Sequence, residues 1–282
     1  MSYTGQTRIF LDSGDPQETQ QIKDLLGFLD GQTTNPSLVA KNPEVQSRIE
    51  QGQGFTSHEL LDIYKDIVKN IQSIIPEGSV SVEVYADRET TVEEMYQQAQ
   101  EMHNWLPQAH IKLPTTTKGL HVARMLVDED INVNMTLCFS QEQAAAVHQA
   151  TKGARKGQVY VSPFIGRLDD KGVHGLDLVE NILTMYRQAD SHVLVLAASI
   201  RHLDHLYACL TLGADIITAG SAVYQEWNKT NQESPDAFDM DTVRSRIAYK
   251  ESLIDTSNLD IHHELTDQGI DKFAQDWNQI LL

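Results

Sequence analysis

Hydrophobic residues along the chain fall into short apolar runs that alternate with longer amphipathic stretches. The short runs have the length of β-strands, and the longer ones carry apolar residues at helical spacing. Eight candidate strands are found, at Arg8–Ser13, Gly31–Asn35, Ser79–Tyr85, Ala109–Pro114, Asn132–Cys138, Val159–Phe164, His192–Ser199 and Ile216–Gly220. The helical stretches that follow them are Glu18–Leu29, His58–Ile75, Val92–Trp105, Lys118–Val127, Gln141–Thr151, Leu176–Arg187, Leu203–Leu212 and Ala222–Asn228. Eight strand-then-helix units predict an α/β fold with a parallel sheet, and eight is the number that closes a (β/α)8 TIM barrel.

An open, doubly wound sheet is the structural alternative, although no GxGxxG follows the first strand to suggest dinucleotide binding. We expect residues 1–232 to form the barrel, which is the catalytic domain. Residues 233–282 are too few for a core of their own, so we expect a C-terminal helical extension that packs on the barrel or at a subunit interface. Its helices are predicted near Asp241–Leu253 and Asp267–Ile280. The segment Asn42–Ser57, rich in Gln and Gly, is expected to be an irregular loop.

Several of the expected strands alternate polar and apolar residues, whereas strands of a parallel sheet buried on both faces are usually apolar throughout. A period of two places the polar residues on one face, which in a closed barrel is the interior. Buried polar groups cost free energy unless they are paired, so their convergence predicts an active site, with a self-satisfied polar plug as the alternative. The residues concerned are Ser81, Glu83, Tyr85, His110, Lys112, Asn132, Asn134 and Thr136.

Lys112 is the first candidate for catalysis, because Ile111, Leu113 and Pro114 around it indicate burial. Burial disfavours the charged form of an amine, and a neutral amine can attack a carbonyl to form a Schiff base. Glu83 is expected at the same depth on the adjacent strand. A carboxylate there can move protons through a water molecule, which the hydroxyl of Thr136 can hold. The alternative is a purely structural ion pair between Lys112 and Glu83.

Other polar residues end neighbouring strands. Asp12 can take a proton from a substrate hydroxyl, or it can cap the following helix. Asn35 precedes Pro36 and is either a turn residue or a ligand of substrate hydroxyls. Asn134 and Ser162 are expected to project into the same interior and to bind the hydroxyls of a sugar-like substrate.

Arg167 and Arg201 follow the sixth and seventh strands, and Ser199 lies two residues before Arg201. Two guanidinium groups and a hydroxyl make a phosphate site, because Arg binds phosphate in a bidentate way. Such a local site is needed, since the net charge of -18 repels anions. The alternative is that both arginines form surface salt bridges with Asp169, Asp170 or Asp204.

The composition fits a soluble globular protein, with 40% hydrophobic and 22% charged residues among 282. The net charge of -18 argues against nucleic acid and anionic membranes as partners. Neither a signal peptide nor a membrane span is visible, so we expect a cytoplasmic protein. Cys138 and Cys209 are expected to be buried thiols, and His110 to pack in the barrel floor. His202 and His205 have the spacing of a helix surface, and we predict no metal site.

Seven segments, taken in chain order, resemble the successive strand-end motifs of the transaldolase family. They are LDSGD, TTNPSL, SVEVYAD, IKLPTTTKGL, NVNMTLCFS, VSPFIGRLDD and ASIRH. The resemblance covers residues 8 to 225, and TTNPSL and SPFIGRLDD are its most specific parts. The segments IKLPTT, GRLDD and SIRH are most similar to the shorter bacterial transaldolases, which are related to fructose-6-phosphate aldolases.

The resemblance implies a role for each matched residue. Lys112 would be the Schiff-base lysine and Asp12 would assist cleavage of the C3–C4 bond, while Glu83 and Thr136 would hold the catalytic water. The substrate would be bound by Asn35, Asn134 and Ser162 at the dihydroxyacetone moiety, by Arg167, Ser199 and Arg201 at the phosphate, and by Phe164 at the pocket wall. Fructose-6-phosphate aldolases tend to carry Tyr and Gln in place of Phe164 and Glu83, so the resemblance favours a transaldolase.

The activity implied is transfer of a dihydroxyacetone unit from fructose 6-phosphate or sedoheptulose 7-phosphate to an aldose phosphate, a step of the pentose phosphate pathway. Small-molecule sugar phosphates would be its partners, and no metal or organic cofactor would be needed, because the lysine provides the electron sink. Three alternatives stay open: an aldolase that releases free dihydroxyacetone, a transaldolase for a related anionic sugar such as a sulfosugar, and a non-catalytic sugar-phosphate-binding barrel. The segment Asn42–Ser57 and the extension are longer than in the short subfamily, and they leave a homo-oligomer open.

Overall fold

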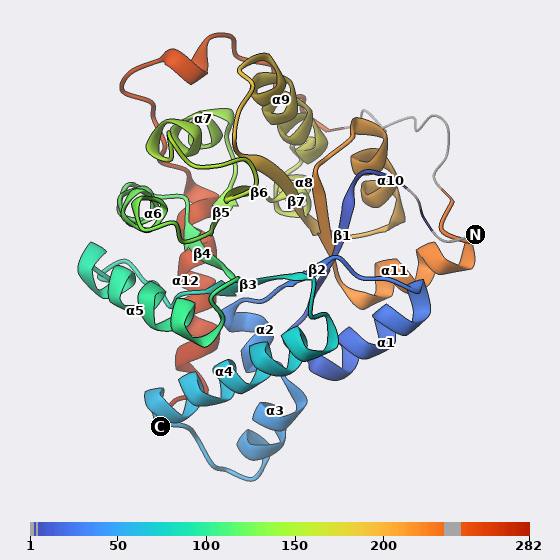
Figure 1. Ribbon diagram of the computed structural model, residues 1–282, viewed down its shortest axis with the longest axis vertical. Coiled ribbons are helices and arrows are strands. Elements are labelled where there is room, and N and C mark those ends of the chain that lie inside the picture. Colours follow the sequence, from blue (N-terminus) through green and yellow to red (C-terminus); the bar gives the residue numbers. More distant parts are fainter. Residues whose placement is uncertain (1–2, 4, 234–243) are drawn as a thin grey trace.

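The computed structural model of the chain describes residue 3 and residues 5–233 and 244–282. Its eight strands are parallel, pair in sequence order and close into a barrel where β8 meets β1 (Figure 1). The strands are β1 (Arg8–Asp12), β2 (Gly31–Thr33), β3 (Ser79–Glu83), β4 (His110–Pro114), β5 (Val133–Cys138), β6 (Val159–Pro163), β7 (Leu194–Ile200) and β8 (Ile216–Ala219). The predicted (β/α)8 barrel is therefore confirmed, and the open sheet is excluded.

A helix follows every strand. The helices are α1 (Pro16–Leu26), α2 (Pro36–Ala40), α3 (Pro43–Glu50), α4 (Ser57–Ile74), α5 (Val92–Trp105), α6 (Thr117–Asp128), α7 (Gln141–Ala150), α8 (Ile165–Asp169), α9 (Gly175–Gln188), α10 (Leu203–Leu212), α11 (Ser221–Lys229) and α12 (Glu264–Asn278), with a 3-10 turn at Leu253–Asp255. Thr56, Thr91 and Ser140 begin α4, α5 and α7 with capping boxes. In each box the hydroxyl and a Glu or Gln three residues later satisfy amide groups that the first helical turn leaves unpaired.

The prediction of an irregular loop at Asn42–Ser57 is wrong, because α3 occupies its first half. Asn42 accepts a hydrogen bond from the amide of Glu44, and Pro43 stands at the first helical position. Asn35 and Pro36 begin α2 in the same way. Both pairs are helix-start signals, but the helices they begin are too short to show an apolar period.

The prediction of a helix at Asp241–Leu253 is also wrong for residues 244–252, which form no helix. Residues 241–243 of the predicted helix lie outside the described residues. From residue 244 to residue 252 the backbone bonds to other parts of the fold. Ser245 exchanges hydrogen bonds with Gly172 and His174, and the amide of Ile247 donates to the carboxylate of Asp177. These long-range bonds replace the local bonds of a helix. By contrast, the helix predicted at Asp267–Ile280 is confirmed as α12, with its ends shifted by two or three residues.

The polar and apolar residues that alternate along the strands face opposite sides of the sheet, as predicted, with the apolar ones toward the outer helices. Val82, Ile111 and Met135 are fully buried in the core shared with the outer helices. A separate apolar cluster of Phe10, Tyr160, Leu196, Ala198 and Ile216 fills part of the barrel interior, and its Leu196 and Ala198 reach the cavity. His110 stacks on Tyr160 with 3.8 Å between ring centroids, as the barrel-floor prediction required. The thiols of Cys138 and Cys209 are buried, as predicted.

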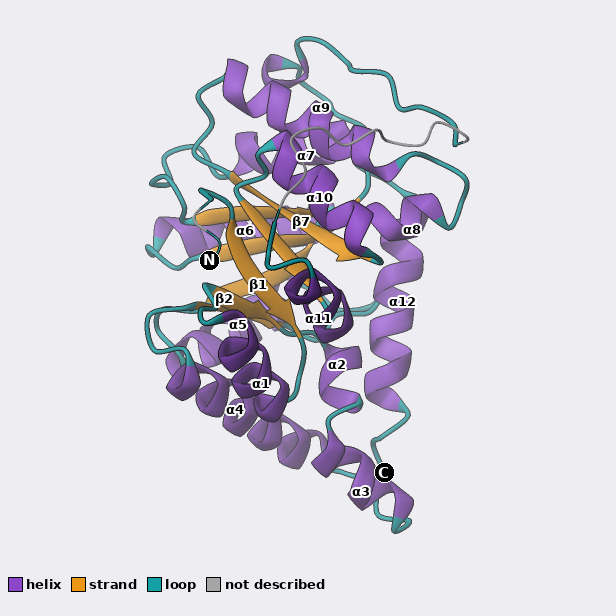
Figure 2. Cartoon of the chain, turned by 90° about the vertical axis from the view of Figure 1, so that its right-hand side faces the viewer, coloured by secondary structure: helices purple, strands orange, loops and turns teal. Residues whose placement is uncertain are grey.

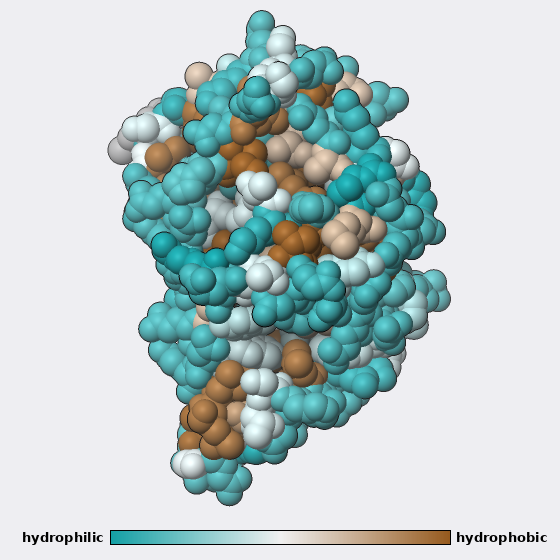
Figure 3. All heavy atoms as spheres, turned by 90° about the vertical axis from the view of Figure 1, so that its left-hand side faces the viewer, coloured by the Kyte–Doolittle hydropathy of each residue, from teal (hydrophilic) through white to brown (hydrophobic). Residues whose placement is uncertain are grey.

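The C-terminal helix α12 crosses one end of the barrel, passing α8 and α2 (Figure 2). Its apolar residues Leu265, Ile270, Phe273 and Trp277 belong to the same hydrophobic core as the barrel. The boundary proposed at residue 232 stays a prediction. None of the helices in the described ranges is long and apolar enough to cross a membrane. Hydrophilic side chains cover most of the face shown in Figure 3.

Gln143 of α7 joins the barrel to the segment that leads into α12. Its carbonyl oxygen accepts the amides of Phe139 and Ser140, at 2.7 and 3.2 Å. Its amide group donates to the carbonyl oxygens of Thr115 and Ile261, both at 3.1 Å, and to the Thr266 hydroxyl at 2.9 Å. The side chain is fully buried, so these groups have no water to replace a lost partner.

We expect Gln143→Leu to lower the free energy of unfolding by about 2–4 kcal/mol, because it leaves several buried polar groups unpaired. Gln149 is the matched control. It also donates to carbonyl groups of the C-terminal segment, at Ile254 and Thr256, but from a partly exposed position. Gln149→Leu should cost under about 1 kcal/mol, since water can replace its bonds. Equilibrium urea unfolding measures both, and equal losses would contradict the role given to Gln143.

Candidate active site

The register of the strands places three polar side chains side by side inside the barrel, and a hydrogen bond adds a fourth. Glu83 of β3 pairs with Lys112 of β4, and Lys112 pairs with Asn134 of β5. The hydroxyl of Ser162 on β6 donates a hydrogen bond of 2.7 Å to the side-chain oxygen Oδ1 of Asn134. The amide group of Asn134 in turn lies 3.1 Å from the hydroxyl of Ser81. The parallel ladder therefore turns residues distant in sequence into one continuous polar layer.

A buried ion pair occupies the centre of this layer. Lys112 Nζ lies 2.8 Å from Glu83 Oε2 and donates to the carbonyl oxygen of Thr34 at 2.9 Å. Both side chains are about 5% exposed. Burial raises the pKa of the Glu83 carboxyl, and the nearby Lys112 offsets that rise only in part. The site thus holds an amine and a carboxylate in direct contact, out of water.

Tyr64 of α4 fixes this pair from outside the barrel. Its hydroxyl accepts the amide of Glu83 at 2.9 Å and lies 2.6 Å from the hydroxyl of Thr34. Thr34 is also the residue whose carbonyl oxygen accepts from Lys112. One buried phenol therefore orients the backbone on both sides of the ion pair. Neither the apolar period of α4 nor a motif distinguishes Tyr64 in the sequence.

Asp12 lies at the end of β1 beside the pair. Its Oδ1 accepts a 2.7 Å hydrogen bond from Thr33, whose hydroxyl is also 2.7 Å from that of Thr218. Burial raises the pKa of Asp12, while Lys112 and the bond from Thr33 act in the opposite direction. Asp12 does not cap α1, because Asp15 does so. Asn35, in contrast, caps α2 and still faces the cavity.

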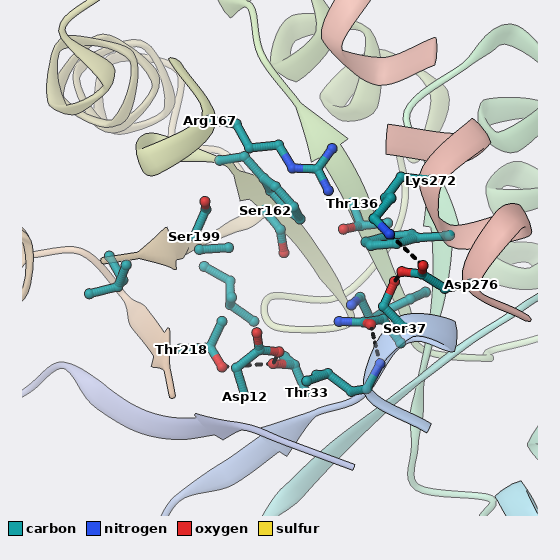
Figure 4. A pocket seen from close by; sticks show the side chains of 18 of the residues that line it. Asp12, Thr33, Ser37, Thr136, Ser162, Arg167, Ser199, Thr218, Lys272 and Asp276 are labelled. Atoms are coloured by element: carbon teal, nitrogen blue, oxygen red, sulfur yellow. Dashed lines mark hydrogen bonds and ion pairs between the residues drawn. The ribbon is translucent and has the colours of Figure 1, made fainter. Parts of the chain in front are cut away.

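A cavity of about 420 Å³ opens above these groups (Figure 4). Of the eleven residues predicted for the site, nine line it, and Glu83 and Asn134 lie beneath its floor in contact with Lys112 and Ser162. The lining residues from the prediction are Asp12, Asn35, Lys112, Thr136, Ser162, Phe164, Arg167, Ser199 and Arg201. The structure therefore brings the predicted residues together at the carboxyl ends of the strands.

Arg167 and Arg201 lie at one end of the cavity but differ in their partners. Arg201 pairs with Asp170 at 2.8 Å, and both side chains are more than half exposed. The salt-bridge alternative thus holds for Arg201, although an exposed pair is weak and a ligand can replace it. Arg167 has no carboxylate within 4.0 Å among the described residues, and burial, followed by the nearby Arg201, lowers its pKa. Ser199 between them has a left-handed backbone, with φ of 58°.

His205 supports this end of the cavity from behind, and its assignment to a helix surface was wrong. The ring is 3% exposed. Nδ1 accepts the amide of Arg201 at 3.3 Å, and Nε2 lies 2.7 Å from the carboxylate of Asp169. The ring therefore joins the loop after β7 to α8, the two segments that carry the arginines.

Eleven lining residues were not predicted from the sequence. Five of them lie on strands, and they are Thr33, Leu196, Ala198, Ile200 and Thr218. The other six come from the α2 region and from α12, and they are Ser37, Leu38, Lys41, Lys272, Phe273 and Asp276. Lys272 pairs with Asp276 at 2.5 Å, and Asp276 also accepts a hydrogen bond from Ser37 (Figure 4). No local pattern could have found Lys272, Phe273 and Asp276, because only the docking of α12 brings them to the cavity, whereas Ser37 lies within the segment TTNPSL.

The fold and the cavity define a (β/α)8-barrel protein with a buried lysine–carboxylate pair at the carboxyl ends of its strands. Residues 9–282 match the Transaldolase/Fructose-6-phosphate aldolase family. The chain belongs to this family, which makes it a transaldolase-type enzyme.

Two relatives named probable transaldolase extend over nearly the whole chain. The protein from Dehalococcoides mccartyi is 34% identical over 97% of this chain and 99% of its own length. The protein from Brucella ovis is 32% identical over 96% of each chain. Among solved structures, 3-hexulose-6-phosphate synthase from Salmonella typhimurium aligns with a TM-score of 0.49 and 11% identity, over 97% of this chain and 99% of that one.

The buried ion pair of Lys112 with Glu83 predicts how the stability of the variant Lys112→Met depends on pH. The change leaves the Glu83 carboxylate without its cation, which costs about 3–5 kcal/mol where the carboxylate is charged. Glu83 already has a pKa above its ordinary 4.5, and losing Lys112 raises it further. At a pH between the pKa of Glu83 in the unfolded chain and its higher pKa in the folded variant, the folded state keeps a proton that the unfolded state has released. The free energy of unfolding of Lys112→Met therefore falls as the pH rises through this range.

We therefore expect the melting temperature of Lys112→Met to lie well below that of the wild type at pH 8 and closer to it at pH 5. The double variant Lys112→Met/Glu83→Gln is the control, since it has no buried carboxylate at position 83 and should lose this pH dependence. A deficit of the single variant that does not change with pH would contradict the assignment.

Proposed function

We propose that the protein is a transaldolase that transfers a dihydroxyacetone unit from a ketose phosphate to an aldose phosphate through a Schiff base on Lys112. The observation that supports this most strongly is the buried contact of Lys112 with Glu83 below a cavity whose far end carries Arg167 and Arg201. A nucleophilic amine and an anion-binding end in one cavity suit a phosphorylated carbonyl compound. Fructose 6-phosphate and sedoheptulose 7-phosphate are the proposed donors.

Covalent chemistry begins when Lys112 passes a proton to Glu83 and its neutral amine attacks C2 of the ketose. The carbinolamine that forms loses water to give the Schiff base. Glu83 and Thr136 are proposed to hold that water. Thr136 Oγ1 is buried and has no hydrogen-bond partner among the described residues, which supports such a role because buried hydroxyls are normally paired.

Cleavage follows when Asp12 takes the proton of the C4 hydroxyl. The C3–C4 bond breaks, the aldose phosphate leaves, and the bonding electrons remain on C3 as an enamine conjugated to the Lys112 nitrogen. Asp12 is suited to this step because its raised pKa makes the carboxylate a better base than an exposed one, and Thr33 orients it. Addition of the enamine to a second aldose and hydrolysis then complete the transfer.

The remaining side chains are proposed to bind the substrate. Asn35, Asn134 and Ser162 would bind the hydroxyls of the dihydroxyacetone unit, and Phe164 would form the wall beside it. At the other end, Arg167, Ser199 and Arg201 would bind the phosphate. Arg201 would exchange its exposed ion pair with Asp170 for the ligand.

Release of free dihydroxyacetone, as by a fructose-6-phosphate aldolase, is the second candidate, because the family includes both activities. We favour transfer because Glu83 and Phe164 are the residues that the resemblance associates with transaldolases. The two functions separate in an assay of fructose 6-phosphate cleavage with and without erythrose 4-phosphate. Sustained turnover only with the acceptor supports the transaldolase, and equal turnover without it would overturn the proposal in favour of the aldolase.

Asp12→Asn should lower kcat for this transfer by about 10²- to 10⁴-fold, the usual contribution of a positioned general base. Asp30→Asn is the control, since Asp30 accepts the amide of Ile9 at the opposite end of β1 and should leave kcat within about twofold. Release of glyceraldehyde 3-phosphate from fructose 6-phosphate measures both. A loss under tenfold in Asp12→Asn would exclude Asp12 as the base.

A further inference from the structure

We propose that α12 completes the phosphate end of the cavity and that Phe273 is a positioning residue for Arg167. This inference rests on the proposed function, since it takes Arg167 to be a phosphate ligand. It assigns a role to the C-terminal extension, for which neither the sequence motifs nor the family match provides one. The family match extends to residue 282, but the last of the seven strand-end motifs ends at His202, so Phe273 lies outside all of them.

The guanidinium of Arg167 contacts two aromatic rings. Its Cζ is 5.8 Å from the ring centroid of Phe164 and 5.7 Å from that of Phe273. Phe164 follows β6, whereas Phe273 comes from α12. No hydrogen bond or ion pair from the Arg167 side chain to any described residue occurs, so aromatic faces rather than a carboxylate hold it. Its N–H donors thus stay available for an anion.

The backbone of α12 also approaches Arg167 closely, at Gly269. A Cβ at this position would lie 3.2 Å from Arg167 Nη1 and 2.5 Å from Leu137 Cδ2. Any larger residue would therefore require the side chain of Leu137 to move and would crowd the guanidinium of Arg167. The glycine lets α12 come near enough for Phe273, one turn later, to cover the guanidinium.

Both ends of α12 are anchored to the barrel, so the ring of Phe273 has a fixed place. Near the start of the helix, the Thr266 hydroxyl donates to the carbonyl oxygen of Leu137 at 2.9 Å. Near its end, Asp276 accepts from Ser37 of α2 and pairs with Lys272. Phe273 lies between these anchors, is 8% exposed and lines the cavity (Figure 4 shows its neighbours Lys272 and Asp276).

An arginine side chain loses much conformational freedom when it binds an anion in one orientation. Two rings within 6 Å of the guanidinium restrict it before the substrate arrives, and the cation–π contacts add attraction. Removing one ring should therefore weaken phosphate binding without altering the chemistry at Lys112. The structure predicts a change in KM and not in kcat.

The test is steady-state transfer from fructose 6-phosphate to erythrose 4-phosphate, together with competitive inhibition by inorganic phosphate. For Phe273→Leu we expect both the KM for fructose 6-phosphate and the inhibition constant of phosphate to rise about 3- to 10-fold, as for a partly desolvated cation–π contact. The kcat should stay within about twofold. Phe273→Tyr keeps the ring and should behave as the wild type. If Phe273→Leu does not fold, Phe273→Met takes its place.

Ile270→Ala is the matched control, because Ile270 is an equally buried residue of α12 that faces a neighbouring hollow instead of the substrate cavity. It should lower the melting temperature but leave both constants unchanged. Unaltered constants in Phe273→Leu, or a fall in kcat with no change in either constant, would overturn the role of Phe273. Arg167→Gln separates this from failure of the proposed function. If Arg167→Gln also leaves both constants unchanged, Arg167 is no phosphate ligand and the proposed site itself is wrong.

Discussion

The contact between Lys112 and Glu83 inside the barrel is the interaction on which the rest of the site depends. Removing two charges from water is costly, and only a close partner and further hydrogen bonds offset that cost. The 2.8 Å ion pair, the carbonyl oxygen of Thr34 and the hydroxyl of Tyr64 provide them. Lys112 also lines the cavity, so its amine is in contact with the space in which a substrate would bind.

The charge of the cavity differs from that of the protein. The chain has 40 acidic and 22 basic residues, yet five cationic and only two acidic side chains line the cavity. The cations are Lys41, Lys112, Arg167, Arg201 and Lys272. An anionic substrate is thus repelled by the net charge but attracted once it reaches the opening. The C-terminal helix adds one of these cations and one of the two rings around Arg167.

How much the sequence predicts depends on whether the signal is local. The period of two in β3, β4 and β5 predicts which residues face the interior, and parallel pairing then brings Glu83 and Lys112 together without further information. Short capped helices such as α3 are not found by a search for apolar periods. The place of Phe273, Lys272 and Asp276 at the cavity is not predictable for another reason. Their helix is predictable, but its docking is set by tertiary contacts at Leu137 and Ser37. For the same reason a segment near residue 247 that looks helical in sequence is extended along α9.

Covalent binding of a ketose phosphate to Lys112 is required by the proposed mechanism, and trapping the Schiff base is the direct test. The enzyme is incubated with fructose 6-phosphate, reduced with borohydride and digested, and the modified peptide is located by mass spectrometry. We expect a substrate-dependent mass increase on Lys112 that is missing from Lys112→Met, with no increase on Lys41 or Lys272. An unmodified Lys112 after reduction of an enzyme that is turning over, or an adduct on another lysine, would contradict the proposed mechanism.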